Sequence, residues 1–216
     1  MINFENVTAK YPGGTGIFNI TFSVEKGEMK FLMGPTGAGK STVLRALYRD
    51  LLSIEGRIFV DGVDVVSLKK HKIPYLRRKI GMIFQDYKLI NDRTVFENIA
   101  LPLHISGTPK KIVNLKVREV AEKVGLENKI KIFPKYLSGG EQQRVSIARA
   151  LVKEPVIVLA DEPTGNLDLN ISDEILDILE IATDSGAAVL MSTHNFPLVR
   201  PRQKQYIELS EGRMIL

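Results

Sequence analysis

The glycine-rich segment GPTGAGKS constrains the fold of this 216-residue chain more than any other feature, because of what flanks it. It occupies residues 34–41 and fits the phosphate-binding pattern GxxxxGK[ST]. The preceding residues 29–33, MKFLM, are continuously apolar, as in a buried central strand. The segment that follows, residues 42–52, repeats apolar side chains at helical spacing, at Val43, Leu44, Leu47 and Leu51. A strand, a glycine-rich loop and a helix in this order predict an α/β fold with phosphate groups bound at the start of the helix.

Each residue type in this loop suits phosphate binding. Glycines let backbone N–H groups converge on phosphate oxygens, and the helix N-terminus adds the positive end of its dipole. Lys40 is predicted to reach the β- and γ-phosphates of ATP, and the Ser41 hydroxyl to ligate Mg²⁺. A glycine-rich turn that merely precedes Lys-Ser is the alternative, and the strand–helix context argues against it. The predicted ATP-binding residues of the loop are Gly34, Pro35, Thr36, Gly37, Ala38, Gly39, Lys40, Ser41 and Thr42.

A second apolar strand, VIVLADEP at residues 156–163, ends in the two carboxylates Asp161 and Glu162. Ligands of parallel sheets bind at the carboxyl ends of the strands, so Asp161 is expected beside the loop, holding Mg²⁺ through water. Glu162 is expected to orient or deprotonate the attacking water. Two acids at a strand end also fit an exposed turn, but the phosphate-binding loop upstream makes that alternative less favourable.

Antiparallel strands are expected beside this core. Residues 18–24 alternate between apolar and polar side chains, with Phe18, Ile20, Phe22 and Val24 on one face, which is typical of a half-buried strand. Asp61 and Gly62 stand between apolar residues and predict a hairpin. Further strands are expected in KIGMIFQ, at 156–160 and at 187–192, and a closing hairpin is expected near the C-terminus.

From about residue 88 to residue 136 the pattern becomes helical. Two helices are expected there, the second with Ile112, Leu115, Val120 and Val124 near one face and Gly125 as its stop. Helices are also expected after LSGG and at 171–182. We therefore predict a single domain over residues 1–216, with an α/β core and β subdomain at 1–87 and 137–216, and an inserted helical subdomain at 88–136.

Composition limits the classes of partner. There is no cysteine, so disulfides and thiolate metal sites are excluded. The longest apolar runs fall far short of the roughly 20 residues that cross a bilayer, so any membrane span is expected on another chain. The net charge of +5 fits a solvated surface, and no nucleic-acid partner is expected. The densest basic run, at residues 69–79, leaves a peripheral contact with an anionic membrane as the weaker alternative.

The segment LSGGEQQR, at residues 137–144, builds a second helix N-terminus with exposed amides and a hydroxyl. Such a terminus is physically an anion site, yet a second one about 100 residues from the first is redundant within one monomer. An N-cap serine with a flexible helix entrance is the simpler alternative, and the residues alone favour it.

LSGGEQQR resembles the signature motif of the ATP-binding cassette (ABC) ATPases. That family pairs two domains head to tail, and the signature of one domain caps the γ-phosphate of ATP on the P-loop of the other. The resemblance therefore implies an α/β P-loop fold of ABC type with a mixed, largely parallel sheet, the ligands ATP and Mg²⁺, and a homodimer on ATP binding. The residues implied to contact the ATP of the partner chain are Ser138, Gly139, Gly140 and Glu141.

Four weaker motifs occur in the order of the family. Tyr11 matches the aromatic residue that stacks on adenine in the family. Gln85 matches the glutamine that contacts Mg²⁺, and His194 matches the switch histidine at the γ-phosphate. Asn166, Leu167 and Asp168 match the loop that crosses the dimer interface. Each residue taken alone also has a structural explanation. Tyr11 could pack against neighbouring side chains, and Gln85 could be a polar residue at a strand end. Asp168 could cap the next helix, and His194 could be a hydrogen-bonded histidine at a strand end. The implied catalytic residues are Lys40, Glu162 and His194, and the implied metal contacts are Ser41, Gln85 and Asp161.

Within the family, residues 73–103, 133–144 and 158–168 resemble the ATPases of bacterial cell division. That branch implies a peripheral position on the cytoplasmic face of the inner membrane and an integral membrane partner resembling FtsX, through which ATP-driven motion controls peptidoglycan hydrolases. The region around Gln85 and the helical subdomain are implied to form the docking groove. The alternatives are an ATPase of lipoprotein release or macrolide export, an amino-acid importer ATPase, and a nucleotide-gated binding module with little hydrolysis.

One segment departs from the family pattern. An Asp and a continuing helix usually follow the switch histidine, whereas this chain has Asn195 there, followed by Pro197 and Pro201. Proline removes a backbone donor, so the helix is expected to be interrupted or delayed.

Overall fold

The computed structural model describes residues 1–51 and 53–215. At its centre lies a six-stranded sheet in the order β10-β9-β3-β8-β7-β6, parallel except for the hairpin of β9 and β10. The predicted core strands and the closing hairpin are confirmed. The strands are β3 (Met29–Met33), β6 (Ile80–Ile83), β7 (Ile157–Asp161), β8 (Ala188–Thr193), β9 (Gln205–Ser210) and β10 (Arg213–Met214).

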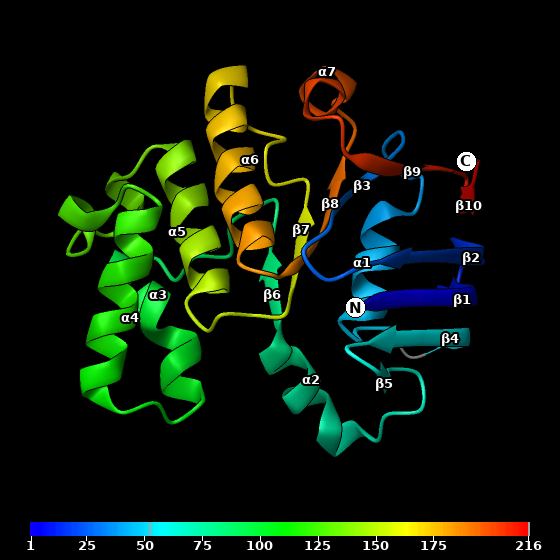
Figure 1. Cartoon of the computed structure of the whole chain (residues 1–216), viewed down its shortest axis with the longest axis horizontal. Coiled ribbons are helices and arrows are strands. Elements are labelled where there is room, and N and C mark those ends of the chain that lie inside the picture. The colour runs from blue at the N-terminus through cyan, green and yellow to red at the C-terminus, as the bar shows by residue number, and fades with distance from the viewer. Residues whose placement is uncertain (52, 216) are drawn as a thin grey trace.

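A second, antiparallel sheet has the order β2-β1-β4-β5 and lies beside the first, with α1 (Lys40–Leu47) between them (Figure 1). Val43, Leu44 and Leu47 of α1 are buried in a core that both sheets share. Asp61 and Gly62 have φ angles of 49° and 75°, as a two-residue hairpin turn requires, so the predicted hairpin is confirmed. The strands of this sheet are β1 (Ile2–Lys10), β2 (Gly16–Val24), β4 (Ile54–Val60) and β5 (Val63–Asp64).

The predicted alternation of β2 is wrong at Phe18. Between the pairs Val7–Ile20 and Ala9–Ile17, β2 holds one residue more than β1, which is a β-bulge. Asn19 in the bulge adopts a φ of 52°, which asparagine tolerates better than most residues. As a result Ile17 is fully buried, while Phe18 is only half-buried.

The helix after the P-loop is also shorter than expected. Tyr48 caps α1, and Arg49 has a φ of 57°, so the helical path ends before Leu51. Leu51 still packs against the shared core, but from the segment that follows the helix.

Helices form the opposite side of the molecule, where α3 (Val95–Ile105), α4 (Lys110–Lys123) and α5 (Gly139–Leu151) lie together (Figure 1). They enclose a core of their own, and α5 also packs on the central sheet through Ile147, next to α6 (Leu169–Asp184). Because α5 belongs to both cores, the subdomain boundary at residue 136 stays a prediction. The fold class itself is confirmed: a mixed α/β sheet with an antiparallel sheet and inserted helices.

The buried face of α4 differs from the predicted one. Ile112 and Leu115 are 40% and 56% exposed. Apolar residues surround this helix on several sides, so its periodicity did not distinguish the faces. The predicted stop is confirmed, since Gly125 has a φ of 68° and the N–H of Leu126 donates to the carbonyl of Ala121 at 2.7 Å. The face that is buried consists of Val113, Val117, Val120 and Val124.

Two short helices complete the described chain, α2 (Ile73–Lys79) and α7 (Phe196–Val199). Asn195 caps α7, and a 3₁₀ turn at Arg200–Arg202 follows it, so the predicted interruption by Pro197 and Pro201 is confirmed. In the described part of the chain, no helix combines the length and the apolar character that a membrane span requires.

The two faces of α4 give a matched test of the helical core. Val117→Ala is expected to lower the free energy of unfolding by roughly 2 kcal/mol, because each buried methyl-sized group contributes about 0.8 kcal/mol and a cavity adds to the loss. Leu115→Ala, on the exposed face, is expected to change it by less than about 0.5 kcal/mol. Urea unfolding of both variants measures the difference, and a larger loss for Leu115→Ala contradicts the packing described.

Candidate functional site

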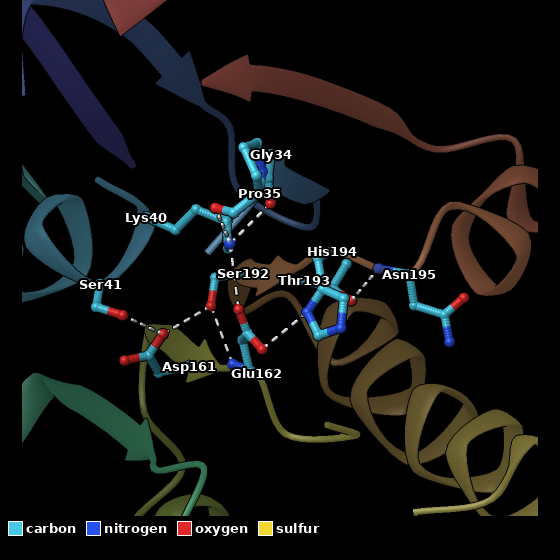
Figure 2. Close-up of polar contacts among 10 residues, drawn as sticks. All are labelled: Gly34, Pro35, Lys40, Ser41, Asp161, Glu162, Ser192, Thr193, His194 and Asn195. Carbon is cyan, nitrogen blue, oxygen red and sulfur yellow. Dashed lines mark hydrogen bonds and ion pairs between the residues drawn. The ribbon is translucent and has the colours of Figure 1, made fainter. Parts of the chain in front are cut away.

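The carboxyl ends of β3, β7 and β8 bring the predicted site residues to one edge of the sheet (Figure 2). The P-loop follows β3, the two carboxylates follow β7, and His194 follows β8. The Ser41 hydroxyl donates to Oδ1 of Asp161 at 2.9 Å, across 120 residues of sequence. Asp161 therefore lies beside the P-loop, as its position at a strand end predicts.

The backbone of the P-loop requires glycine for two reasons. Gly34 and Gly39 have φ angles of 140° and 104°, which other residues rarely adopt. A Cβ on Gly34 would lie 2.2 Å from the carbonyl oxygen of Leu209, and one on Gly39 would lie 2.9 Å from Cγ2 of Ile17. The loop thus folds tightly against neighbouring strands, and α1 begins directly after it, at Lys40.

Lys40 lies at the centre of the site and is nearly buried. Its ammonium donates to the carbonyls of Gly34 and Pro35, at 2.8 and 3.0 Å, and pairs with Oε1 of Glu162 at 3.1 Å. An ammonium has three N–H donors, so these contacts account for all of them. A buried charge needs such partners, and any phosphate that binds Lys40 must take the place of one of them.

Glu162 links the P-loop to the histidine (Figure 2). Its Oε2 lies 3.0 Å from Nδ1 of His194, and a carboxylate only accepts, so Nδ1 carries a proton in this contact. Glu162 has a φ of 43°, an unusual backbone conformation for a residue with a side chain, and such conformations cluster at functional sites. The imidazole is 54% exposed, so its other nitrogen is open to a ligand.

Ser192, on β8, supports both carboxylates, and the sequence reasoning missed it. Its hydroxyl donates to Oδ1 of Asp161 at 2.7 Å and accepts from the backbone N–H of Glu162 at 2.9 Å. In the sequence, Ser192 directly follows the apolar run 187–191, which marks a polar side chain near a strand end but does not show which groups it contacts.

Tyr11 contacts the helix that follows the P-loop, and Gln85 lies at the end of β6. The Tyr11 hydroxyl accepts from Nη1 of Arg45 on α1 at 3.5 Å, and this hydrogen bond raises the pKa of Arg45. Gln85 is exposed after β6, and a Cβ placed on Gly165 would lie 3.5 Å from its Nε2 and 3.6 Å from Oε2 of Glu162. The roles of both side chains stay predictions.

The signature segment lies at the start of α5, away from the P-loop. Ser138 caps the helix in a capping box: its hydroxyl accepts from the N–H of Glu141 at 3.3 Å, and Oε2 of Glu141 accepts from the N–H of Ser138 at 2.9 Å. A Cβ on Gly140 would lie 2.8 Å from Cγ2 of Ile171, so this glycine lets α5 approach α6. Among the described residues, no hydrogen bond or ion pair joins 138–141 to 34–42.

The loop before α6, like the signature segment, supplies a residue that caps the following helix. Oδ1 of Asp168 accepts from the N–H of Ile171 at 3.0 Å and caps α6, as one of the two interpretations of this residue expected. Leu167 is half-buried and packs against the core, while Asn166 is exposed. These contacts fix the path of the loop and leave its proposed role at a dimer interface untested.

The residues at this edge fit a magnesium ion that is held together with a nucleotide. No cluster of three or more potential His, Asp or Glu ligands occurs in the described part of the chain. Mg²⁺ typically uses one or two carboxylates and completes its shell with water and substrate phosphates, so such a cluster is not required. The oxygens of Ser41 and Asp161, 2.9 Å apart, are suitably placed for this.

Comparison with known proteins identifies the class. The ABC transporter family matches residues 17–165, which include the P-loop, the signature segment and both carboxylates. The chain therefore belongs to the ABC transporter family and is an ATP-binding ATPase of the ABC type.

Relatives that match over the full length of the chain identify a branch of this family. The chain is 46% identical to the cell division ATP-binding protein FtsE of Escherichia coli K12 over 215 residues, covering 99% of this chain and 97% of that protein. It is 43% identical to FtsE of Streptococcus pneumoniae serotype 2, covering 100% of this chain and 94% of the relative. It is thus an ABC ATPase of the FtsE type.

Solved structures agree with this fold. The dimeric structure of MJ0796, a bacterial ABC transporter cassette, superposes with a TM-score of 0.89 at 33% identity, over 100% of this chain and 97% of that one. A post-hydrolysis dimer of the same cassette, bound to ADP and Pi, gives the same TM-score at 32% identity and the same coverage.

Ser192→Ala tests the contact that orders both carboxylates. The variant is expected to lose roughly 1 kcal/mol of the free energy of unfolding. The N–H of Glu162 and Oδ1 of Asp161 each lose one of two hydrogen bonds, and they keep those to the carbonyl of Ser192 and the hydroxyl of Ser41. Ser185→Ala is the control, since its hydroxyl bonds Ile181 at an exposed position. Urea unfolding measures both variants. Equal stability of Ser192→Ala and the parent contradicts the assigned contacts.

Proposed function

We propose that this chain is the ATP-hydrolysing subunit of a membrane complex of the FtsE–FtsX type, in which it controls peptidoglycan hydrolysis during cell division. The observation that supports this most directly is the full-length similarity to FtsE, together with the gathering of Lys40, Ser41, Asp161, Glu162 and His194 at one sheet edge. In this proposal the chain lies on the cytoplasmic face of the membrane, and ATP-driven closure of two copies moves the membrane partner.

Lys40 is proposed to hold the β- and γ-phosphates of ATP. It reaches them by exchanging its contact with Glu162 for a phosphate oxygen, because its three donors are otherwise engaged. The exchange frees Oε1 of the Glu162 carboxylate. Nucleotide binding thereby prepares the group that acts in the next step.

Glu162 is proposed as the base that orients the attacking water and accepts its proton. Its second oxygen stays on Nδ1 of His194, which fixes the plane of the carboxylate. The open Nε2 side of His194 is proposed to contact the γ-phosphate. Mg²⁺ held by Ser41, by Asp161 through water and by Gln85 would neutralise charge on the phosphates.

The active unit is proposed to be a head-to-tail homodimer. A helix leaves its first amides without partners in the helix, and the capping box of α5 uses only those of Ser138 and Glu141. The amide of Gly139, which is exposed, is thus available to an anion from another chain. The dimer of MJ0796, a relative with the same fold, supports such an assembly.

Lys40→Ala is expected to weaken ATP binding by roughly 1.5–3 kcal/mol, because a charge-assisted contact to phosphate is lost. Calorimetry with ATP and Mg²⁺ measures the change. Lys26→Ala, an exposed lysine in the turn between β2 and β3, serves as the control. Unaltered affinity of Lys40→Ala rejects the assignment of this loop.

Glu162→Gln is expected to bind ATP but to remain in a closed dimer, because the amide cannot accept the proton of water. Light scattering with ATP and Mg²⁺ should show a dimer that persists, whereas the parent chain returns to its ATP-free state after turnover. Glu55→Gln, at an exposed position on β4, controls for the change in charge. Parent-like hydrolysis by Glu162→Gln excludes this residue as the base.

The membrane partner is tested by capture with the same variant. Tagged Glu162→Gln chain with ATP and Mg²⁺ is recovered from solubilised native membranes, and the proteins that accompany it are identified. Recovery of an FtsX-type membrane protein with a large extracytoplasmic domain supports the proposal. Recovery of a many-span permease with a solute-binding protein identifies an importer and overturns the division role.

A further inference from the structure

The net positive charge of the chain is concentrated in one segment, residues 69–79, which we call the basic segment. It holds six Lys and Arg and no Asp or Glu, whereas the net charge of the whole chain is +5. The rest of the sequence is therefore close to neutral, although it holds most of the charged residues. Charges that serve solvation alone are mixed in sign, so this concentration indicates an anionic partner.

The basic segment lies at the edge of the sheet opposite the candidate active site. It comprises a 3₁₀ turn, Lys70–Lys72, and the helix α2, which leads directly into β6. Because β6 runs parallel to β7, α2 lies at the amino ends of these strands, and Figure 1 shows it at the end of the molecule opposite α7. The P-loop and both carboxylates follow the carboxyl ends. The anion that this segment attracts is therefore not the nucleotide.

Two of the six cations are engaged within the chain. Arg77 lies over the ring of Tyr48, with Cζ 4.5 Å from the ring centroid, and donates to the carbonyl of Tyr48 at 3.0 Å. Lys79 pairs with Asp61 at 2.8 Å. The other four cations are exposed, and none of them has an ion pair among residues 1–51 and 53–215: Lys69, Lys70, Lys72 and Arg78.

Tyr75 is an exposed aromatic residue between two of these cations. Its side chain is 60% exposed, and Nζ of Lys72 and Cζ of Arg78 lie 5.7 and 5.2 Å from the centroid of its ring. Leu76, the next residue, is buried in the core that both sheets share, so it fixes α2 with the ring of Tyr75 outside. Aromatic rings beside Lys and Arg are typical of segments at the membrane–water interface.

The chemistry of these side chains favours a lipid surface over an acidic protein segment. A protein segment is recognised in pockets that fix individual side chains, whereas an anionic lipid surface attracts any dense cluster of exposed cations. Lysine carries its charge on a flexible stem, and Lys70 and Lys72 are both exposed. Their ammonium groups are thus suited to headgroup phosphates that change position.

We propose that the basic segment binds an anionic lipid surface directly, without the membrane partner. Lys69, Lys70 and Lys72 contact headgroup phosphates, and the ring of Tyr75 enters the headgroup layer beside them. The inference rests on the proposed function for the presence of a membrane beside the chain. It adds a lipid contact of the chain itself, at the edge of the sheet that the proposed head-to-tail contact does not use.

A tryptophan reporter tests the position of Tyr75. The chain contains no Trp, so Tyr75→Trp introduces a single indole. The full chain is mixed with vesicles of phosphatidylcholine alone, or of phosphatidylcholine and phosphatidylglycerol in equal parts. The indole emission is expected to shift to shorter wavelengths with the anionic vesicles only. Tyr206→Trp, on β9 and 46% exposed, is the control. An unchanged emission from position 75, or an equal shift from position 206, overturns the inference.

Charge reversal tests the lysines. Lys70→Glu with Lys72→Glu is expected to weaken sedimentation with the anionic vesicles at least tenfold, because two attractive charges become repulsive. Lys26→Glu with Lys204→Glu alters the net charge equally at exposed positions and is expected to leave binding nearly unchanged. Arg78 stays unchanged in both variants, because it also lines the neighbouring groove beside α3. If thermal unfolding shows that the first variant is unfolded, Lys70→Gln with Lys72→Gln replaces it, with a smaller loss in the same direction.

Two further measurements separate this inference from the proposed function. ATP hydrolysis without lipid and capture of an FtsX-type partner in detergent are both expected to be unaffected by Lys70→Glu with Lys72→Glu. Vesicle binding that does not depend on these lysines overturns the lipid contact and leaves the proposed division ATPase standing. A loss of partner capture in detergent, with vesicle binding unchanged, identifies the basic segment as a protein contact and also overturns the inference.

Discussion

The ion pair between Lys40 and Glu162 is the contact on which the arrangement of the site depends. It joins the loop after β3 to the turn after β7, two strands that are separated in the sheet by β8. The same carboxylate reaches His194 at the end of β8, so the ends of three parallel strands converge on one side chain. In the proposed mechanism, a phosphate bound to Lys40 therefore changes the surroundings of the proposed base directly.

Features set by local chemistry could be predicted from the sequence. The P-loop, the Asp161–Glu162 strand end and the Asp61–Gly62 turn each depend on neighbouring residues, and each lies where predicted. Features set by tertiary contacts could not. The bulge at Asn19 depends on the register with β1, and the support of Asp161 by Ser192 depends on the pairing of β7 with β8. Polar and buried contacts of this kind leave no periodic signal.

The glycines of the signature segment have two compatible explanations. Within the chain, Gly140 permits close packing of α5 on Ile171, and Ser138 caps the helix. These contacts fix the start of α5 and leave the amide of Gly139 without a partner within the helix. A structural role in one chain and a proposed role toward the nucleotide of another chain thus require the same residues.

The head-to-tail dimer is the central claim, and a mixing experiment tests it most directly. Ser138→Arg blocks the signature, and Lys40→Ala disables the P-loop, so neither variant alone forms an intact composite site. A heterodimer of the two combines the P-loop of the first with the signature of the second and holds one intact site. ATP hydrolysis is therefore expected to appear when the two inactive variants are mixed. A mixture that remains as inactive as its components contradicts the composite site.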